Sequence, residues 1–169
     1  MSIPPRLFLD ACTLTTAANS PEGGSARLLN IAAEGKVRLS ATRLVMHEAK
    51  VNINDLLGRP LWVWFCRVIG SLRLSLCESP TAAEKAKWAK VPSPKDTHVL
   101  AGAIKAKADI LISLDRRHIL NQSVQEAFPI PIMSPGEFLQ TYGFVGPRPA
   151  GHPPKKRPLT ESVHKKGDR

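Results

Sequence analysis

Four acidic residues occupy positions where alternating strands and helices would gather their carboxylates in one cleft. Asp10 and Asp115 follow short apolar runs that are typical of buried parallel strands. Asp96 stands at the start of a helical segment, and Glu48 lies within another. Converging carboxylates repel one another, and a divalent cation is the ordinary way to stabilise them. Oxygen ligands suit hard ions such as Mg²⁺ or Mn²⁺, so these residues predict metal-assisted phosphodiester chemistry.

Each acid also has a purely structural interpretation. Asp96 is expected at the third position of its helix, where a carboxylate completes a capping box and interacts favourably with the helix dipole. Glu48 alone would be a solvated helix residue, and Asp10 and Asp115 would simply turn the chain after a strand. The acids are therefore informative through their order and spacing rather than singly.

Hydrophobic patterning predicts strands that alternate with helices along most of the chain. Strands are expected at 6–9, 36–41, 72–77, 109–114 and 131–133. Caps and helix breakers indicate helices at 25–34 with Ser25 as the cap, at 42–57, 61–69, 81–89 and 93–106, and after Ser134. This alternation predicts a parallel sheet with helices on both faces, in which ligands bind beyond the carboxyl ends of the strands.

Composition and charge divide the chain into two parts. The 169 residues, 43% hydrophobic and 22% charged, suffice for one domain with a buried core. The net charge of +10 favours polyanionic partners such as nucleic acid or an acidic protein. Residues 146–169 hold seven basic and two acidic residues and five of the fifteen prolines. We therefore expect a domain over residues 1–144 and a disordered basic tail over 145–169, which either contacts phosphates or is simply solvated.

The cysteines and apolar segments bear on the cellular compartment. Cys12, Cys66 and Cys77 are too few and too scattered for a disulfide framework or a metal site, and we expect buried, reduced thiols. The most apolar stretch, 61–69, is too short to cross a bilayer, and the run at 7–9 is too short for a signal peptide. These features predict a cytoplasmic protein without membrane contact.

Five segments in a fixed order resemble the PIN domain, a family of metal-dependent nucleases that includes the VapC-like toxins of bacterial toxin–antitoxin pairs. The segments are LDAC at 9–12, SATRLVMHE at 40–48, KDTHVLAGA at 95–103, ADILISLD at 108–115 and MSPGEFL at 133–139. The resemblance extends from about Arg6 to Tyr142 and is closest to the branch of toxin components.

The resemblance implies a three-layer α/β/α fold around a five-stranded, mostly parallel sheet. It also implies an endoribonuclease that hydrolyses RNA phosphodiester bonds with Mg²⁺ or Mn²⁺, the toxin of a type II toxin–antitoxin pair. The acidic active-site positions of the family fall on Asp10, Glu48, Asp96 and Asp115. Asp10, Asp96 and Asp115 would bind the metal, and Glu48 would act at the edge of the cleft, directly or through a water.

Three further residues are expected close to the acids. Ser113 matches the family's small hydroxyl before the last acid, and His98 either faces the cleft or lies in the interior as a structural histidine. Cys12 stands where a small polar residue, often Asn, is usual, so one hydrogen bond is expected to be lost. Arg117 replaces a further acid, which argues against a second metal.

Partners are predicted from the resemblance and from one apolar segment. RNA, a cognate antitoxin and a second copy of the chain, forming a homodimer, are the expected partners. One helix face of a small domain cannot bury all of segment 61–69, which favours a dimer or antitoxin surface. Trp62, Trp64 and Phe65 are expected to divide between the core and such a contact.

Other functions and other histidines fit the sequence less well. His47 and His118 show no ligand spacing, and we expect both to be solvated. A haloacid-dehalogenase-like phosphatase needs a second Asp two residues after Asp10, where Cys12 stands. The chain has no Gly-rich phosphate loop of a nucleotide triphosphatase. The remaining alternative is a non-catalytic PIN-fold module that binds RNA or serves in assembly, with metal binding weakened by the departures at Cys12 and Arg117.

Overall fold

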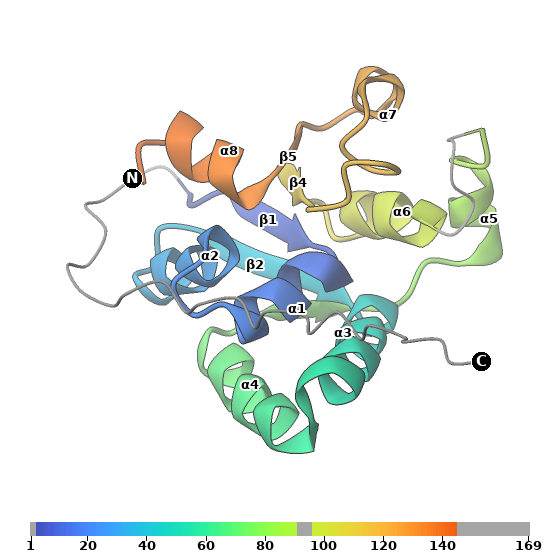
Figure 1. Ribbon diagram of the computed structural model, residues 1–169. Coiled ribbons are helices and arrows are strands. Elements are labelled where there is room, and N and C mark those ends of the chain that lie inside the picture. The colour runs from blue at the N-terminus through green and yellow to red at the C-terminus, as the bar shows by residue number, and fades with distance from the viewer. Residues whose placement is uncertain (1–2, 91–95, 145–169) are drawn as a thin grey trace, which may run out of the picture.

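Five short strands form one parallel sheet in a computed structural model that describes residues 3–90 and 96–144 (Figure 1). The strands are β1 (Arg6–Leu9), β2 (Arg38–Thr42), β3 (Ser75–Cys77), β4 (Ile110–Ile112) and β5 (Ile132–Met133). Their order is β3-β2-β1-β4-β5, and each neighbouring pair is parallel. The strand order reverses at β1, which is the position where sheets of this kind bind ligands.

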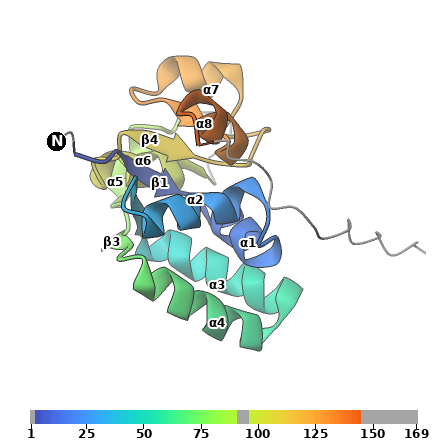
Figure 2. The same ribbon diagram turned by 90° about the vertical axis from the view of Figure 1, so that its left-hand side faces the viewer.

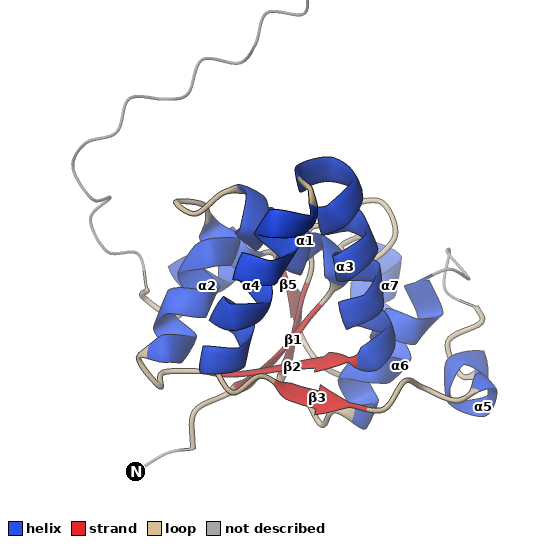
Figure 3. Cartoon of the chain, turned by 90° about the horizontal axis from the view of Figure 1, so that it is seen from below, coloured by secondary structure: helices blue, strands red, loops and turns tan. Residues whose placement is uncertain are grey.

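Helices cover both faces of the sheet, which confirms the three-layer α/β/α architecture (Figure 3). They are α1 (Ala11–Asn19), α2 (Gly24–Ala33), α3 (Arg43–Leu57), α4 (Arg59–Ser71), α5 (Ala82–Ala86), α6 (Thr97–Lys105), α7 (Gln122–Ala127) and α8 (Pro135–Thr141). Helices α1 to α4 lie on one face, with α3 and α4 side by side in Figure 2, and α6 packs on the other.

Several helix ends lie where the cap residues predicted them. Thr42 Oγ1 accepts a hydrogen bond from the Val45 backbone N–H (3.2 Å) at the start of α3. Gly58, with φ +87°, separates α3 from α4, because this backbone conformation favours glycine. Ser134 and Glu137 form a reciprocal capping box at the start of α8.

One predicted helix start is wrong, and another lies outside the described residues. Helix α2 begins at Gly24 after Gly23 as N-cap, and Ser25 is buried in its first turn instead of capping it. Helix α6 runs over Thr97–Lys105 in the described residues, with Asp96 directly before it and without a capping hydrogen bond from the Asp96 side chain among them. The predicted start at 93–95, with Asp96 as the third helical residue, lies outside the described residues.

The cysteine prediction is also partly wrong. Cys12 and Cys66 are exposed and Cys77 is half-buried, although all three are free thiols as expected.

Helices α1 and α7 were not predicted, because the Thr-rich α1 has weak helical patterning and α7 is only one and a half turns long.

Helix α6 packs very closely on the sheet because Gly102 has no side chain at the contact. A Cβ at Gly102 would lie 2.9 Å from both Phe8 Cζ and Thr42 Cγ2. Phe8 is fully buried in β1, and Thr42 ends β2, so neither neighbour can easily retreat. This contact sets the position of α6 and therefore of Asp96 at its start.

Phe144 closes the described part of the chain. Its backbone N–H donates to Leu139 O (2.8 Å), its carbonyl accepts from Arg27 Nε (3.1 Å), and its ring stacks on Phe138. The predicted tail, 145–169, lies outside the described residues. Within the described residues, no helix is both long and apolar enough to cross a membrane.

Candidate active site

Two of the four acids emerge where β1 and β4 end side by side. Leu9 of β1 is in register with Ile112 of β4, and the Asp10 backbone N–H donates to Ile112 O (3.3 Å). Asp10 follows β1 directly, whereas Asp115 lies in the turn after β4. Parallel pairing of two central strands therefore brings residues about a hundred positions apart in sequence to one edge of the sheet.

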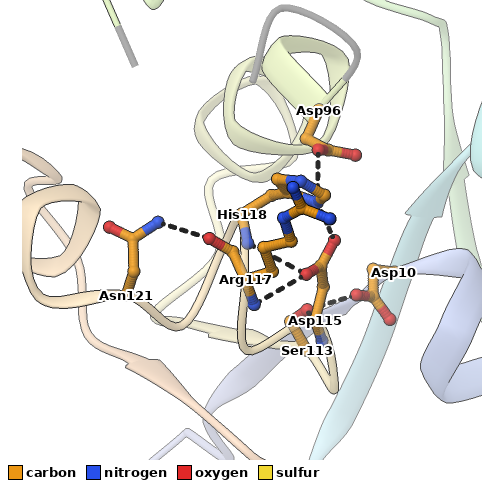
Figure 4. A network of polar contacts seen from close by, with 7 residues as sticks. All are labelled: Asp10, Asp96, Ser113, Asp115, Arg117, His118 and Asn121. Carbon is orange, nitrogen blue, oxygen red and sulfur yellow. Dashed lines mark hydrogen bonds and ion pairs between the residues drawn. The ribbon is translucent and has the colours of Figure 1, made fainter. Parts of the chain in front are cut away.

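Asp10 is a buried carboxylate with two hydrogen-bond donors. Its side chain caps α1 by accepting from the Thr13 backbone N–H (2.7 Å), and the Ser113 hydroxyl donates to its other oxygen (Figure 4). Burial raises the pKa of Asp10 above its ordinary value, the hydrogen bonds from Ser113 and Thr13 oppose this shift, and the nearby Asp115 charge adds to it.

Asp115 is held by the turn that it begins. Its Oδ1 accepts from the backbone N–H groups of Arg117 (3.0 Å) and His118 (2.9 Å), and its own N–H donates to Ser113 Oγ (3.0 Å). Partial burial raises the pKa of Asp115, but hydrogen bonds from the backbone and ring of His118 and from Arg117 outweigh it, and the net shift is downward. Ser113 thus links the Asp10 carboxylate, whose pKa is raised, to the backbone N–H of Asp115, whose side-chain pKa is lowered.

The other two acids reach the same place from helices. Glu48 projects from α3, and its Oε2 lies 3.0 Å from His98 Nε2 of α6. Asp96 is the residue before α6 begins. One pocket of about 140 Å³ is lined by all four acids together with Ala11, Cys12, His98, Val99 and Ile119. The structure therefore brings the predicted acids together, although their catalytic roles stay a prediction.

His118 is a member of the site that the sequence analysis missed. Its Nδ1 lies 3.0 Å from Asp115 Oδ2 and 3.7 Å from Asp96 Oδ2 (Figure 4). The ligand atoms of these three residues all lie within 4.8 Å of one another, and Asp10 is not a member of this group. The prediction of a merely solvated His118 is wrong. The sequence did contain a signal for this contact, namely the spacing of three residues between Asp115 and His118. Side chains three positions apart in a helical turn lie beside each other.

The departures at Cys12 and Arg117 have different consequences. The Cys12 thiol lines the pocket, and partial desolvation together with the negative charges of the four acids raises its pKa to about 11. It is therefore a neutral thiol at physiological pH. Arg117 is exposed and contributes its backbone N–H to Asp115.

A larger and chemically different cavity lies between α3, α4 and β3. We call it the α3–α4 groove; it measures about 420 Å³ and is lined by Met46, His47, Lys50, Trp62, Cys66, Ile69, Gly70, Arg73, Leu74 and Leu76. Leu76 is 50% exposed, and Trp64 on the neighbouring surface of α4 is 46% exposed. As predicted, α4 cannot bury all of its apolar side chains.

Comparison with solved structures defines the class of fold. VapC20 from Mycobacterium tuberculosis, a sarcin–ricin loop cleaving toxin, is similar with a TM-score of 0.51 and 16% identity, over 66% of this chain and 91% of that chain. VapBC2 from Rickettsia felis, bound to a DNA fragment from its promoter, has a TM-score of 0.56 and 11% identity, over 76% and 98%. These similarities establish a VapC-like fold.

The sequence itself identifies the family. A sequence model of the PIN domain matches residues 6–117, a range that contains all four pocket acids. This chain therefore belongs to the PIN-domain family. No curated protein sequence matches it.

Proposed function

We propose that this protein is a metal-dependent endoribonuclease that hydrolyses RNA phosphodiester bonds with Mg²⁺ or Mn²⁺. The observation that carries the proposal is the pocket lined by acidic side chains from four separate elements. Membership of the PIN-domain family and a fold shared with a toxin that cleaves the sarcin–ricin loop support it. The net positive charge of the chain suits a polyanionic substrate.

The donor set of the pocket fits a hard divalent cation. Carboxylate oxygens are the ligands that Mg²⁺ and Mn²⁺ prefer, and a buried carboxylate such as Asp10 costs free energy unless its charge is compensated. We propose that Asp10, Asp96 and Asp115 hold the ion. When bound, it would supply water activation and charge stabilisation on the leaving oxygen.

The neighbouring side chains would orient the acids and a water. Ser113 fixes the rotamer of Asp10 by its hydrogen bond, and His98, only 7% exposed, holds Glu48 at the edge of the pocket. Glu48, whose side chain is 38% exposed, can accept a proton from a water that approaches the phosphodiester. The Cys12 thiol, neutral at physiological pH, adds no further negative charge.

Single substitutions of the acids test this proposal. Asp10→Asn and Asp96→Asn should each lower RNA cleavage in Mg²⁺ or Mn²⁺ by about 100-fold or more, because each removes a charge that holds the ion. EDTA should abolish cleavage by the wild type. Asp55→Asn on the exposed surface of α3 is the matched control and should cleave normally.

A wild type that cleaves no RNA with any divalent cation would contradict the proposal. If it bound RNA nonetheless, the non-catalytic PIN-fold module would be the correct alternative. Circular dichroism and thermal melting of each variant separate lost chemistry from lost folding.

We also propose that the enzyme acts as a toxin restrained by an antitoxin, and that the α3–α4 groove receives an apolar antitoxin helix with an acidic flank. The lining is mostly apolar, its charged members Lys50 and Arg73 are basic, and no acid from the described part of the chain lines it. The similar VapBC2 structure is a toxin–antitoxin complex, which supports a partner of this kind.

A negative charge introduced into the groove tests the antitoxin proposal. Leu76→Asp should prevent co-purification with the product of the adjacent open reading frame, while free enzyme still cleaves RNA. Leu56→Asp, on an exposed side chain outside the groove, is the matched control. Loss of a wild-type homodimer with retained binding of that product would assign the groove to a second copy instead.

A further inference from the structure

The ring of His118 is held beside two acids of the pocket, Asp96 and Asp115, by hydrogen bonds within its own turn. The turn after β4 is closed at its start by Asp115, whose Oδ1 accepts from the His118 backbone N–H, and at its end by Asn121, whose Nδ2 donates to Arg117 O (3.0 Å) (Figure 4). Asn121 also caps α7. Ile119, next to His118, is buried and anchors the turn in the core. The ring therefore has a defined place beside Asp115.

The distances around His118 Nδ1 match those between neighbouring ligands of one cation. In an octahedral site with ligands at about 2.1 Å, adjacent ligand atoms lie about 3 Å apart. The Nδ1 atom lies 3.0 Å from Asp115 Oδ2 and 3.7 Å from Asp96 Oδ2. All three ligand atoms lie within 4.8 Å of one another, so small side-chain shifts would let the ring nitrogen bind an ion together with both carboxylates.

The geometry points to His118 as a nitrogen ligand of the divalent cation, and we propose that it biases the site toward Mn²⁺ over Mg²⁺. Mg²⁺ is bound through carboxylate oxygens and keeps several waters. Mn²⁺ also takes carboxylate oxygens, but as a first-row transition metal it accepts a nitrogen ligand more readily than Mg²⁺ does. This inference rests on the proposed metal site and adds what the acids alone do not specify, which is the preference between the two ions.

The alternative role for the ring is purely structural. In that role Nδ1–H donates to Asp115 Oδ2 and orients the carboxylate. The two roles differ in one respect: a ligand changes the affinity for Mn²⁺ much more than that for Mg²⁺, whereas an orienting group changes both equally.

Direct metal binding to the full-length chain distinguishes these roles. Calorimetric titration with Mn²⁺ and with Mg²⁺ should show that His118→Ala weakens Mn²⁺ binding by about tenfold and Mg²⁺ binding by less than about twofold. His47→Ala, an exposed histidine on α3 that lies in the other cavity, should leave both affinities unchanged. Equal weakening for the two ions, or none for Mn²⁺, would overturn the inference.

Pulsed EPR of the Mn²⁺ complex gives a second, spectroscopic readout. Nitrogen hyperfine coupling to Mn²⁺ is expected in the wild type and in His47→Ala, and it should disappear in His118→Gln. If the His118 variants do not fold, absence of nitrogen coupling in the wild type still overturns the inference. Asp96→Asn should lose affinity for both ions; if it binds both normally, the proposed metal site itself fails, independently of His118.

Discussion

The acidic pocket and the α3–α4 groove lie on the same small domain and are built on opposite principles. The groove is three times larger, at about 420 against 140 Å³, and its wall is made mostly of apolar side chains. In the pocket, the Asp10 carboxylate accepts hydrogen bonds from the Thr13 backbone N–H and the Ser113 hydroxyl, and the Asp115 carboxylate accepts from backbone N–H groups of its own turn. The chemistry that we propose therefore belongs to the smaller of these two cavities, the one in which carboxylates are held.

The difference reflects what each region demands of the fold. Burying a carboxylate is costly without compensating donors, so the pocket lies where strand ends and helix starts supply them. An exposed apolar surface needs no hydrogen-bond donors to compensate a buried charge. Such surfaces are typical of contacts with a partner. The two regions should thus respond to substitution in opposite ways.

The largest expected effect separates catalysis from partner binding. Glu48→Gln should lower RNA cleavage by about 100-fold, because it removes the carboxylate that we propose as the base at the pocket edge, and should leave antitoxin binding intact. Leu76→Ala in the groove should leave cleavage unchanged and weaken partner binding. Cleavage rates and pull-down with purified partner measure both. If both variants impaired the same activity, the two regions would not be functionally separate.

Substitution of one glycine near each region should change the free energy of unfolding in opposite directions. Gly102→Ala should destabilise the fold by about 1–3 kcal/mol, because the new Cβ would press on Phe8 and Thr42 beneath the pocket. Gly70→Ala, in α4 beside the groove, meets no atom within 4 Å and should stabilise by about 0.5–1 kcal/mol through helix propensity. Urea denaturation gives both values, and effects of the same sign would contradict the packing described for α6.

Removal of residues 145–169 tests whether part of the RNA affinity comes from a segment outside the acidic pocket and the α3–α4 groove. This segment is proposed as a basic tail, and the truncated chain should remain folded with an unchanged melting temperature. Its RNA affinity should depend less steeply on salt, because fewer phosphate contacts are made. Fluorescence anisotropy at several salt concentrations measures the slope, and an unchanged slope would remove the tail from RNA binding.

The smallest expected effect concerns Glu84 of α5, which packs against α6 on the face of the sheet away from α1 to α4, and it is an effect of pH on stability. Hydrogen bonds from the Thr81 backbone N–H and from Lys105 of α6 lower the pKa of Glu84 from 4.5 to about 2. Because the folded pKa is depressed, the contribution of Glu84 to stability is full above pH 4.5 and is lost as the pH falls through about 2. Glu84→Gln should therefore melt at a lower temperature at neutral pH, by an amount that shrinks below pH 4.5. A difference independent of pH would exclude this role.

Much of the site was predictable because local rules placed it. Asp10 and Asp115 follow apolar strands, and parallel strands end at one edge of a sheet. Thr42 and Ser134 marked helix starts through side-chain caps that depend only on neighbouring residues. The motif segments around the acids, taken together and in order, were enough to predict the family, which the match of a PIN-domain model to residues 6–117 confirms.

Other features depended on neighbours far away in the sequence. Helix α1 is weakly patterned by itself and is stabilised by contacts with α2 and α3. Cys12 looked like a core residue because its sequence neighbours are apolar, but it lies on the pocket side of α1 and is exposed. Local patterns report the propensity of a segment, not the surface against which it finally packs.

The sequence by itself determined the parallel α/β architecture and the set of four acids, because periodicity, caps and strand ends are local properties. Only the tertiary structure decided that His118 joins Asp96 and Asp115, since that meeting requires α6 to pack on the sheet at Gly102 and the turn after β4 to fold back toward it. Residues distant in sequence meet through packing, and packing is a property of the whole chain.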